Sequence, residues 1–442
     1  MHTLEDLKAG RLAGITRLDL ACGLTEFPRE IFSLADSLEV LNLSGNALRS
    51  LPDDLGRLRH LKVLFCSDNP FTTLPASIGQ CSELRIVGFK ANRIEQVPAS
   101  ALPPRLRWLI LTDNCLTELP EALGNCPDLQ KLMLAGNRLT SLPASLARCQ
   151  KLELVRIAAN RLPALPDWLL QLPRLAWLAY AGNPLPGDFS KPHDPGHTAE
   201  IDWSRLQLQH LLGEGASGVI HQALWRRDAQ ADLPVAVKLY KGDITSDGSP
   251  LNEMSACIAA GIHPQLIRVE GRISNHPQGG RGLVMDLIEP GFANLAGPPS
   301  LESCSRDVYA AGTRFSAAVA LCIARGIAAV AAHLHGLGIS HGDLYGHNIL
   351  WNKQGECLLG DFGAASFYPQ EDEQAAALQR IEVRAFGILL GELLEHSEAG
   401  AGRDKLEALQ ARCCQPDVLS RPDFVQICQA LQQFDSNIAA IL

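Results

Sequence analysis

The first part of the chain repeats one pattern of apolar positions about every 23 residues. Apolar and polar residues alternate over a short L-x-L-x-x-N stretch, as at 41–46 and 132–137. Alternation over a few residues is typical of a β-strand, so each repeat is predicted to contain one short strand. Successive asparagines lie 22 or 23 residues apart, and they are Asn46, Asn69, Asn92, Asn114, Asn137, Asn160 and Asn183.

An irregular first copy, at 18–22, places Cys22 where the later copies have asparagine. A Leu-Pro or Val-Pro pair follows five residues after each of the first six asparagines. The period and the frame resemble a leucine-rich repeat, whose signature accepts Asn or Cys at this point. The resemblance implies an α/β solenoid over residues 1–186, in which stacked coils share one core. The asparagine side chains would bond the backbone of the turns between coils.

Strand alternation also predicts which side chains face outward. One outward column is Val40, Val63, Ile86, Trp108, Lys131, Leu154 and Trp177, and the next is Asn42, Phe65, Gly88, Ile110, Met133, Arg156 and Ala179. Scattered apolar residues are normal on a surface, but contiguous apolar patches usually mark contact sites. We therefore expect a protein-binding surface whose partner is another protein or the second half of this chain. It would include Phe65, Trp108, Ile110, Met133 and Trp177.

The pattern changes after residue 186. Residues 187–203 are rich in Pro and Gly, which predicts a linker. A strand pattern then runs into Gly213, Gly215 and Gly218 in a G-x-G-x-x-G motif, and the apolar runs 224–225 and 235–238 predict further strands. A dinucleotide-binding unit would need a helix after its glycines, so the order of strands argues against that class of protein.

Further motifs follow in a fixed order. They are V-A-V-K at 235–238, H-G-D-L-x-x-x-N at 341–348, D-F-G at 361–363, E-V-R-A-F-G at 382–387 and R-P at 421–422. Together with the glycine motif they resemble the eukaryotic-type protein kinase domain. The resemblance implies an α+β, bilobal domain over residues 204–442 that uses ATP and Mg²⁺ to phosphorylate Ser or Thr hydroxyls of proteins.

The resemblance also implies roles for individual residues. Gly213, Gly215 and Gly218 would cover the phosphates, and Lys238 would bind the α- and β-phosphates while it pairs with Glu253. Asp343 would orient the attacking hydroxyl, and Asn348 and Asp361 would hold Mg²⁺. The adenine would be lined by Ile220, Ala236, the gatekeeper Met285 and the backbones of Asp286 and Ile288.

The second half departs from the kinase pattern at several positions. Gly342 replaces the arginine that in many kinases contacts a phosphorylated activation segment, and Tyr345 replaces a lysine that touches the γ-phosphate. Only 20 residues separate Asp361 from Ile381, with no A-P-E triplet, so the usual peptide-docking platform and the glutamate partner of Arg421 are missing. Residues 371–380 suit a helix.

Two alternatives therefore stay open. Small-molecule kinases of the aminoglycoside and choline type also use an H-G-D motif and lack A-P-E. The third interpretation is a weakly active pseudokinase scaffold, in which the repeats carry the function by binding a partner. Serine/threonine rather than tyrosine specificity, the substrate, the activating signal and the oligomeric state are not determined by the sequence.

Composition and charge limit the partners and the cellular location that we expect for the protein. The net charge of −9 argues against non-specific binding to nucleic acid or to an anionic membrane. The N-terminus lacks the bases and apolar core of a signal peptide, and the apolar run at 317–339 is interrupted by charged and polar residues, so we expect a buried helix there. The 13 cysteines form no C-x-x-C pair. We expect a cytoplasmic chain of bacterial type.

Overall fold

The computed structural model describes residues 2–185 and 198–438, except 216, 229–230, 243, 246, 399 and 401. These residues group into two compact units. The first comprises Met1–Leu172 and Asn183–Leu185, and the second comprises Pro173–Gly182 and Pro186–Leu442. Residues 187–197 of the predicted linker lie outside the described residues.

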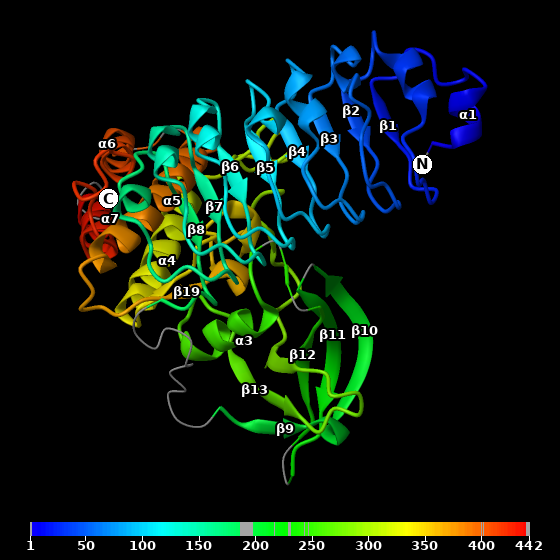
Figure 1. The fold of residues 1–442 in the computed structure, drawn as a ribbon. Helices are drawn as coiled ribbons and strands as arrows, with labels where there is room; N and C mark the ends of the chain where they lie inside the picture. Colours follow the sequence, from blue (N-terminus) through cyan, green and yellow to red (C-terminus); the bar gives the residue numbers. More distant parts are fainter. Residues whose placement is uncertain are drawn as a thin grey trace. The chain divides into compact units, whose positions relative to one another are not determined.

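The first unit is a solenoid of short parallel strands, as the repeat pattern predicts. Each strand pairs in register with the next, for example Val40 with Val63, and the strands stack side by side from blue to cyan in Figure 1. They are β1 (Arg17–Asp19), β2 (Val40–Asn42), β3 (Val63–Phe65), β4 (Ile86–Gly88), β5 (Trp108–Ile110), β6 (Lys131–Met133) and β7 (Leu154–Arg156). The central residue of β2, Leu41, and its equivalents in the other repeats are buried, as predicted. Several of the predicted outward residues are buried as well, namely Val63, Ile86, Lys131, Leu154 and Arg156, so the expected solvent face is only partly exposed.

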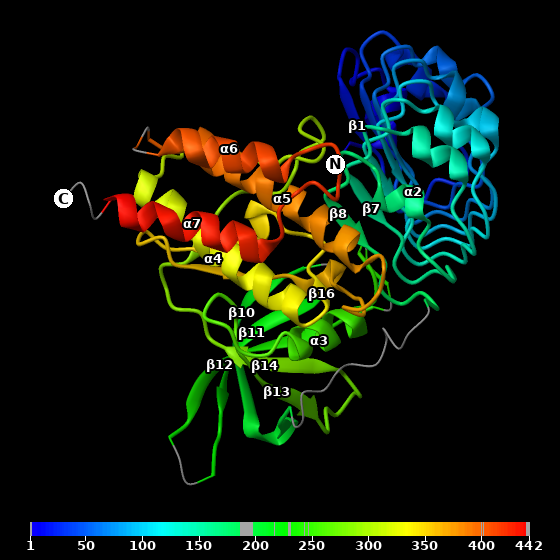
Figure 2. The same ribbon diagram turned by 90° about the vertical axis from the view of Figure 1, so that its left-hand side faces the viewer.

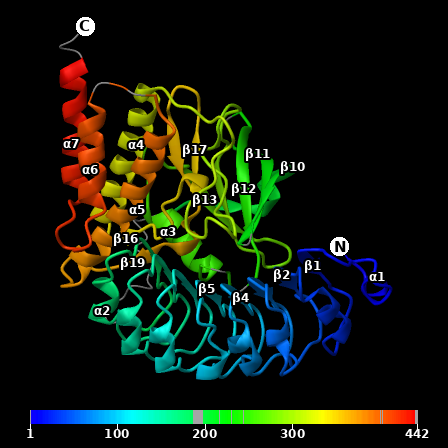
Figure 3. The ribbon, with the colours of Figure 1, turned by 90° about the horizontal axis from the view of Figure 1, so that it is seen from above.

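Short helical turns return the chain between strands on the other side of the unit (Figure 3). They are η1 (Arg29–Leu34), η2 (Leu55–Arg57), η3 (Ala76–Gln80), η4 (Ala99–Ala101), η5 (Glu121–Asn125), η6 (Ala144–Arg148) and α2 (Asp167–Leu170), where η denotes a 3₁₀ helix. Helix α1 (Leu4–Lys8) precedes the first strand. Cys81, Cys126 and Cys149 are buried at equivalent positions of these turns, which confirms them as packing residues.

The asparagines bond the backbone as predicted. Asn114 is typical, because its Oδ1 accepts from the amide of Ile94 at 2.9 Å while its Nδ2 donates to the carbonyls of Phe89 and Leu111. Each such side chain satisfies backbone groups of two successive coils that the short strands leave unpaired. The asparagine column therefore holds the coils in register.

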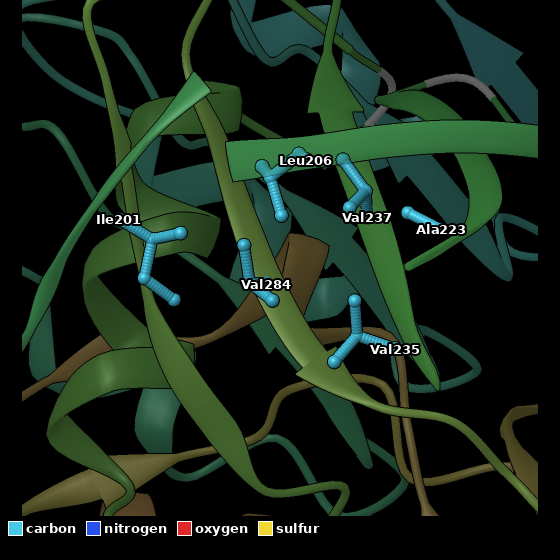
Figure 4. Packing of buried hydrophobic residues seen from close by; sticks show 6 residues of the cluster. All are labelled: Ile201, Leu206, Ala223, Val235, Val237 and Val284. Atoms are coloured by element: carbon cyan, nitrogen blue, oxygen red, sulfur yellow. The ribbon is translucent and has the colours of Figure 1, made fainter. Parts of the chain in front are cut away.

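The second unit begins with a six-stranded, mostly antiparallel sheet in the order β10-β11-β12-β14-β13-β9. Its elements are β9 (Glu200–Asp202), η7 (Trp203–Arg205), β10 (Leu206–Glu214), β11 (Gly218–Trp225), β12 (Leu233–Tyr240), α3 (Pro250–Ala259), β13 (Val269–Ser274) and β14 (Gly282–Asp286). Ile201, Leu206, Ala223, Val235, Val237 and Val284 form the apolar core on one face of this sheet (Figure 4). The antiparallel order excludes a dinucleotide-binding βαβ unit for this part of the chain.

The rest of the second unit is mainly helical, and its long helices lie together in Figure 2. The helices are α4 (Ala317–Gly336), α5 (Ala375–Glu395), α6 (Arg403–Cys413) and α7 (Phe424–Ile438). Between them lie β15 (Ala293–Asn294), β16 (Ile339–Ser340), η8 (Gly346–Asn348), β17 (Ile349–Trp351), β18 (Cys357–Leu359), η9 (Phe362–Ala364) and β19 (Ser366–Phe367). The predicted two-lobed architecture is confirmed.

Helix α4 is the predicted buried helix at 317–339. Among the described residues it is the one helix long and apolar enough to cross a membrane, and half of its most apolar stretch is buried in the protein. It packs against α5, α7, β16 and β18. Ten of its residues, including Leu321, Ile327 and Leu334, are buried among these elements, as expected for a core helix.

Strand β8 (Trp177–Ala179) continues the repeat pattern in the sequence, but it groups with the second unit. It lies within residues Pro173–Gly182, which we call the 173–182 segment. The predicted domain limits at 186 and 204 remain predictions.

Candidate active site

A buried ion pair joins the sheet to helix α3. Lys238 of β12 and Glu253 of α3 are in contact, with side-chain exposures of 13% and 2%. Ser249 caps α3 and Pro250 begins it, which sets Glu253 in the first turn facing the sheet. Burial disfavours the lysine charge, but the Glu253 carboxylate raises the pKa of Lys238 above its ordinary value. The lysine is therefore a cation at neutral pH, and Asp361 adds to this effect.

The glycine motif forms the turn between β10 and β11, where the amide of Gly215 donates to the carbonyl of Gly218 at 2.9 Å. The three glycines differ in their surroundings. A Cβ at Gly218 would lie 2.4 Å from the Leu239 carbonyl oxygen, whereas Gly213 and Gly215 face open space. The close packing of Gly218 against β12 therefore requires a residue without a side chain. The open space at Gly213 and Gly215 leaves room for a ligand to approach the backbone.

The predicted adenine-lining residues come together on neighbouring strands. Ala236 and Met285 are paired across β12 and β14, and Ile220 of β11 packs against their cluster. Asp286 ends β14, and its amide donates to the Arg268 carbonyl at 2.9 Å. Ile288 follows two residues after the strand. The sheet thus gathers three of the five predicted positions, Ile220, Ala236 and Met285, in one apolar cluster.

Residues 341–348, which we call the catalytic loop, place Asp343 beside Asn348. The Nδ2 group of Asn348 donates to the Asp343 side chain at 2.7 Å and to its carbonyl at 2.9 Å. Because both amide hydrogens are used in this way, the Oδ1 oxygen of Asn348 is the group that can meet a cation. His341 anchors the start of the loop, since its Nε2 donates to the Gly360 carbonyl at 2.8 Å.

Asp361 follows directly after Gly360. It has a left-handed backbone with a φ of +52°, and its carboxylate accepts from the Gly363 amide at 3.1 Å. Phe362 is buried and its ring lies 5.1 Å from that of His341. The phenyl ring therefore points inward while the aspartate remains exposed. The charge of Asp361 contributes to the raised pKa of both Lys238 and Glu253, so the three side chains share one region.

Glu382 of α5 holds the start of the catalytic loop through hydrogen bonds, a role that the sequence analysis did not identify. Its carboxylate accepts from the amides of Gly342 and His341 at 2.7 and 3.3 Å, and His335 Nε2 lies 2.6 Å from it. Burial alone would raise the pKa of Glu382, but these partners lower it below its ordinary value. A buried carboxylate with its partners in place keeps the loop in one conformation.

Asp307 fixes the other end of the loop. Its buried carboxylate accepts from the amide of His347 at 3.0 Å and lies 2.7 Å from the ring Nδ1. Burial opposes the imidazolium charge, but the hydrogen bond to Asp307 raises the pKa of His347 above its ordinary value. Nearby, Tyr309 donates to Glu392 at 3.2 Å. Burial, with the Asp307 charge, raises the pKa of Glu392 to about 8.

Tyr345 and Trp177 differ from the expectations for them. The Tyr345 ring is buried and stacks on Trp177, with centroids 4.1 Å apart and planes 6° apart. Trp177 is 0% exposed, so it is not available to bind another protein, and of the two partners expected for its column it contacts the second half of the chain. The sequence pattern places it on the outward face of a strand correctly, but that face is covered by the catalytic loop within the second unit.

The activation segment, residues 361–381, is short as predicted. Strand β19 pairs with β16, and α5 begins at Ala375. The helix therefore starts four residues later than the predicted 371 and runs on without a break past 380. Arg421 lacks the usual glutamate, and its buried guanidinium donates instead to the carbonyls of Gln415, Arg380 and Pro173 at 2.8 to 3.0 Å. Burial lowers the pKa of Arg421 to about 10.

Comparison with protein families finds matches in both parts of the chain. Residues 206–386 match the family described as protein tyrosine and serine/threonine kinase. Residues 104–169 and 37–58 match leucine-rich-repeat families. The kinase match begins at β10 and ends within α5, so it spans the ion pair, the catalytic loop and the activation segment.

Several curated proteins resemble part of the chain. Human ephrin type-A receptor 8 is 28% identical over 43% of this chain and 18% of the receptor. A probable serine/threonine-protein kinase of Arabidopsis thaliana is 26% identical over 37% of this chain and 21% of that protein. The chain thus spans less than a quarter of either relative. A solved leucine-rich-repeat protein of Leptospira interrogans is 29% identical, covering 36% of this chain and 47% of that one, with a TM-score of 0.31.

Proposed function

We propose that this chain, which carries leucine-rich repeats and a protein kinase domain, transfers the γ-phosphoryl group of ATP to Ser or Thr hydroxyls of protein substrates. The observation that carries the proposal is the buried Lys238–Glu253 ion pair beside Asp361. A protonated lysine held in this way is suited to neutralise the α- and β-phosphates. Phosphoryl transfer depends mainly on positioning and charge stabilisation.

The donor set fits Mg²⁺. Asn348 Oδ1 and the exposed Asp361 carboxylate offer the hard oxygen ligands that this ion prefers. When bound, the ion would offset the charge of the phosphates. Asp343 lies within hydrogen-bond distance of Asn348, so a substrate hydroxyl near the metal would meet the Asp343 carboxylate, which can orient it for attack. The glycine motif would cover the phosphates.

Two observations favour the other candidate functions, a scaffold and a small-molecule kinase. The Tyr345 ring brings no positive charge to the position where kinases hold a lysine, which favours a weakly active scaffold. The short activation segment lacks a peptide-docking platform, which favours a small-molecule acceptor. We retain the protein substrate because the kinase family match covers residues 206–386 and repeats of this kind suit protein recognition.

The repeats would recruit the substrate or a regulator through their strand face. Phe65, Trp108, Ile110 and Met133 are half-buried there. The Trp108 indole donates to Met133 Sδ at 3.2 Å and lies 4.2 Å from the Lys131 amine. The Phe65 ring lies across Gly88, where a Cβ would be 2.5 Å from it. Aromatic anchors of this kind are enriched in interfaces.

We place the chain in the cytoplasm, where ATP is available and its 13 free thiols stay reduced.

Transfer of labelled phosphate tests the proposal. The wild-type chain, Asp343→Ala and Lys238→Met would be incubated with Mg²⁺ and γ-labelled ATP, with itself and a protein panel as acceptors. We expect labelling of protein by the wild type and a loss of at least about 100-fold in each variant. Equal labelling by all three would rule out the enzyme, and transfer to an amino alcohol or sugar alone would establish the small-molecule alternative.

A further inference from the structure

The 173–182 segment contacts the catalytic loop and the activation segment inside the second unit. We propose that Trp177 is a positioning residue for phosphoryl transfer, which holds Leu344 and Tyr345 and thereby keeps Asp343 aligned. This proposal rests on the proposed kinase activity. It assigns to one side chain a role that family motifs do not include, since Trp177 lies outside the matched residues 206–386.

Two contacts connect the Trp177 side chain to the loop. The indole Nε1–H donates to the Leu344 carbonyl at 3.0 Å, and the indole ring stacks on Tyr345 at 4.1 Å. The Arg306 guanidinium lies 5.6 Å from the indole centroid. A fully buried indole with its N–H bonded has a single orientation. The two residues that directly follow Asp343 are therefore held by one rigid group.

The residue before Asp343 is held as well. The Gly342 amide donates to Glu382, and a Cβ on Gly342 would lie 2.8 Å from the Leu178 carbonyl oxygen and 2.6 Å from that of Ala364. The backbone next to Trp177 thus occupies the space that a side chain at 342 would need. Asp343 is fixed on both sides, by Glu382 from one direction and by the 173–182 segment from the other.

The same segment also holds the start of the activation segment. The amides of Tyr180 and Ala181 both donate to Ser366 Oγ at 3.1 Å, and the Tyr180 hydroxyl lies 3.3 Å from the Phe367 carbonyl. Ser366 and Phe367 follow closely after Asp361. In kinases with an arginine before the catalytic aspartate, a phosphorylated residue orders this region. Here hydrogen bonds from within the chain do so without a phosphate.

The arrangement favours a positioning role over an inhibitory one. The Lys238–Glu253 pair is formed and Phe362 is buried while the 173–182 segment is in place. An inhibitory segment would be expected to separate the lysine from the glutamate or to displace Phe362. The segment therefore accompanies an assembled site.

Two variants of Trp177 separate the contacts. Trp177→Phe keeps a ring against Tyr345 but removes the donor to Leu344, and Trp177→Ala removes both. We expect kcat for transfer to casein and to the chain itself to fall about 3- to 10-fold in the first and about 100-fold in the second. The affinity for Mg²⁺-ATP should stay within about twofold of wild type, because Lys238, Glu253 and Asp361 are unchanged.

Trp168→Phe and Trp168→Ala are the matched controls, since Trp168 is half-buried in the first unit. Hydrogen exchange of the amides at 341–348 gives a readout that does not need catalysis. It should speed up in Trp177→Ala and not in the Trp168 variants. Unchanged kcat, increased kcat, or unchanged exchange at 341–348 would each overturn the proposal. If Trp177→Ala does not fold, Trp177→Phe alone decides by the same criteria.

Absence of transfer by the wild-type chain would defeat the proposed function instead. The exchange comparison would still show whether Trp177 holds the loop. The two failures can therefore be told apart.

Discussion

The backbone conformation and the close neighbours of Gly342 explain why this position of the catalytic loop carries no side chain. Its φ is +72°, a conformation that residues with a Cβ rarely adopt, and two carbonyl oxygens lie within 3 Å of where a Cβ would be. The arginine found here in many kinases could be accommodated only if the 173–182 segment moved. The substitution that looks like the loss of a regulatory arginine is therefore a packing requirement of this chain.

Restoring the arginine should damage the protein. We expect Gly342→Arg to lower the free energy of unfolding by about 2–4 kcal/mol, through backbone strain and the clash with the Leu178 carbonyl. Urea denaturation measures the change. Gly336→Ala is the control, because that glycine ends α4 in open space with an ordinary φ, and it should change stability by less than about 1 kcal/mol. Similar effects of the two substitutions would contradict this explanation.

Glu392 gives a second prediction at the residue scale, in this case on pH. Its pKa is raised to about 8 in the folded chain from an ordinary value of 4.5, mainly by burial. The folded state therefore binds a proton that the unfolded state has released between these values. The stability due to this group is fully present below about pH 4.5 and is lost as the pH rises through about 8.

Glu392→Gln removes this titration. Thermal unfolding of both chains from pH 5 to pH 8 should show the wild type losing about 1–3 kcal/mol more than the variant over that range. The glutamine can still accept from Tyr309, so the two chains should be similarly stable at pH 5. Parallel pH profiles would mean that the carboxyl is not protonated in the folded state.

Among the elements, those with a local cause were predictable from the sequence. The repeat strands follow from a 23-residue period, and β10 to β12, α3 and the loop at 341–348 follow from motifs in order along the chain. Asp307, Glu382 and Trp177 could not be found in this way, because each acts on the catalytic loop from a distant part of the sequence. The E-V-R-A-F-G motif was a signal for Glu382, and the replacement of arginine by Gly342 was a signal for a close neighbour.

The asparagine column allows a prediction for one element of the solenoid. Asn114→Ala removes an acceptor for Ile94 and donors for two buried carbonyls. We expect a loss of about 2–3 kcal/mol in stability and faster amide exchange in the adjacent coils, because each repeat depends on its neighbours. Asn92→Ala, at a less buried copy, should cost less. Uniform exchange along all repeats would argue against nearest-neighbour coupling.

On the scale of the whole molecule, the division into units does not follow the division of the sequence pattern. Residues 173–182 carry the repeat pattern but belong to the second unit. A kinase fragment cut at the end of the repeat pattern would therefore lack Trp177 and Tyr180. Its catalytic loop and activation segment would lose the hydrogen bonds that these residues provide.

Two fragments test this consequence. We expect residues 173–442 to unfold at a higher urea concentration than residues 186–442, with a difference of about 2 kcal/mol from the burial of one tryptophan. A third fragment, 173–442 with Trp177→Ala, should behave like the shorter one. Equal midpoints for the first two would show that the segment adds no stability to the kinase domain.

The bond between Trp177 and Leu344 joins residues 167 positions apart in the chain. Contacts of such long separation form late, since a large loop must close before they are gained. During synthesis the indole leaves the ribosome well before the loop that covers it, and it stays exposed to solvent until most of the kinase domain has been made. The contact can therefore form only after residue 344 has been made, and a chain interrupted before that point would present an uncovered tryptophan.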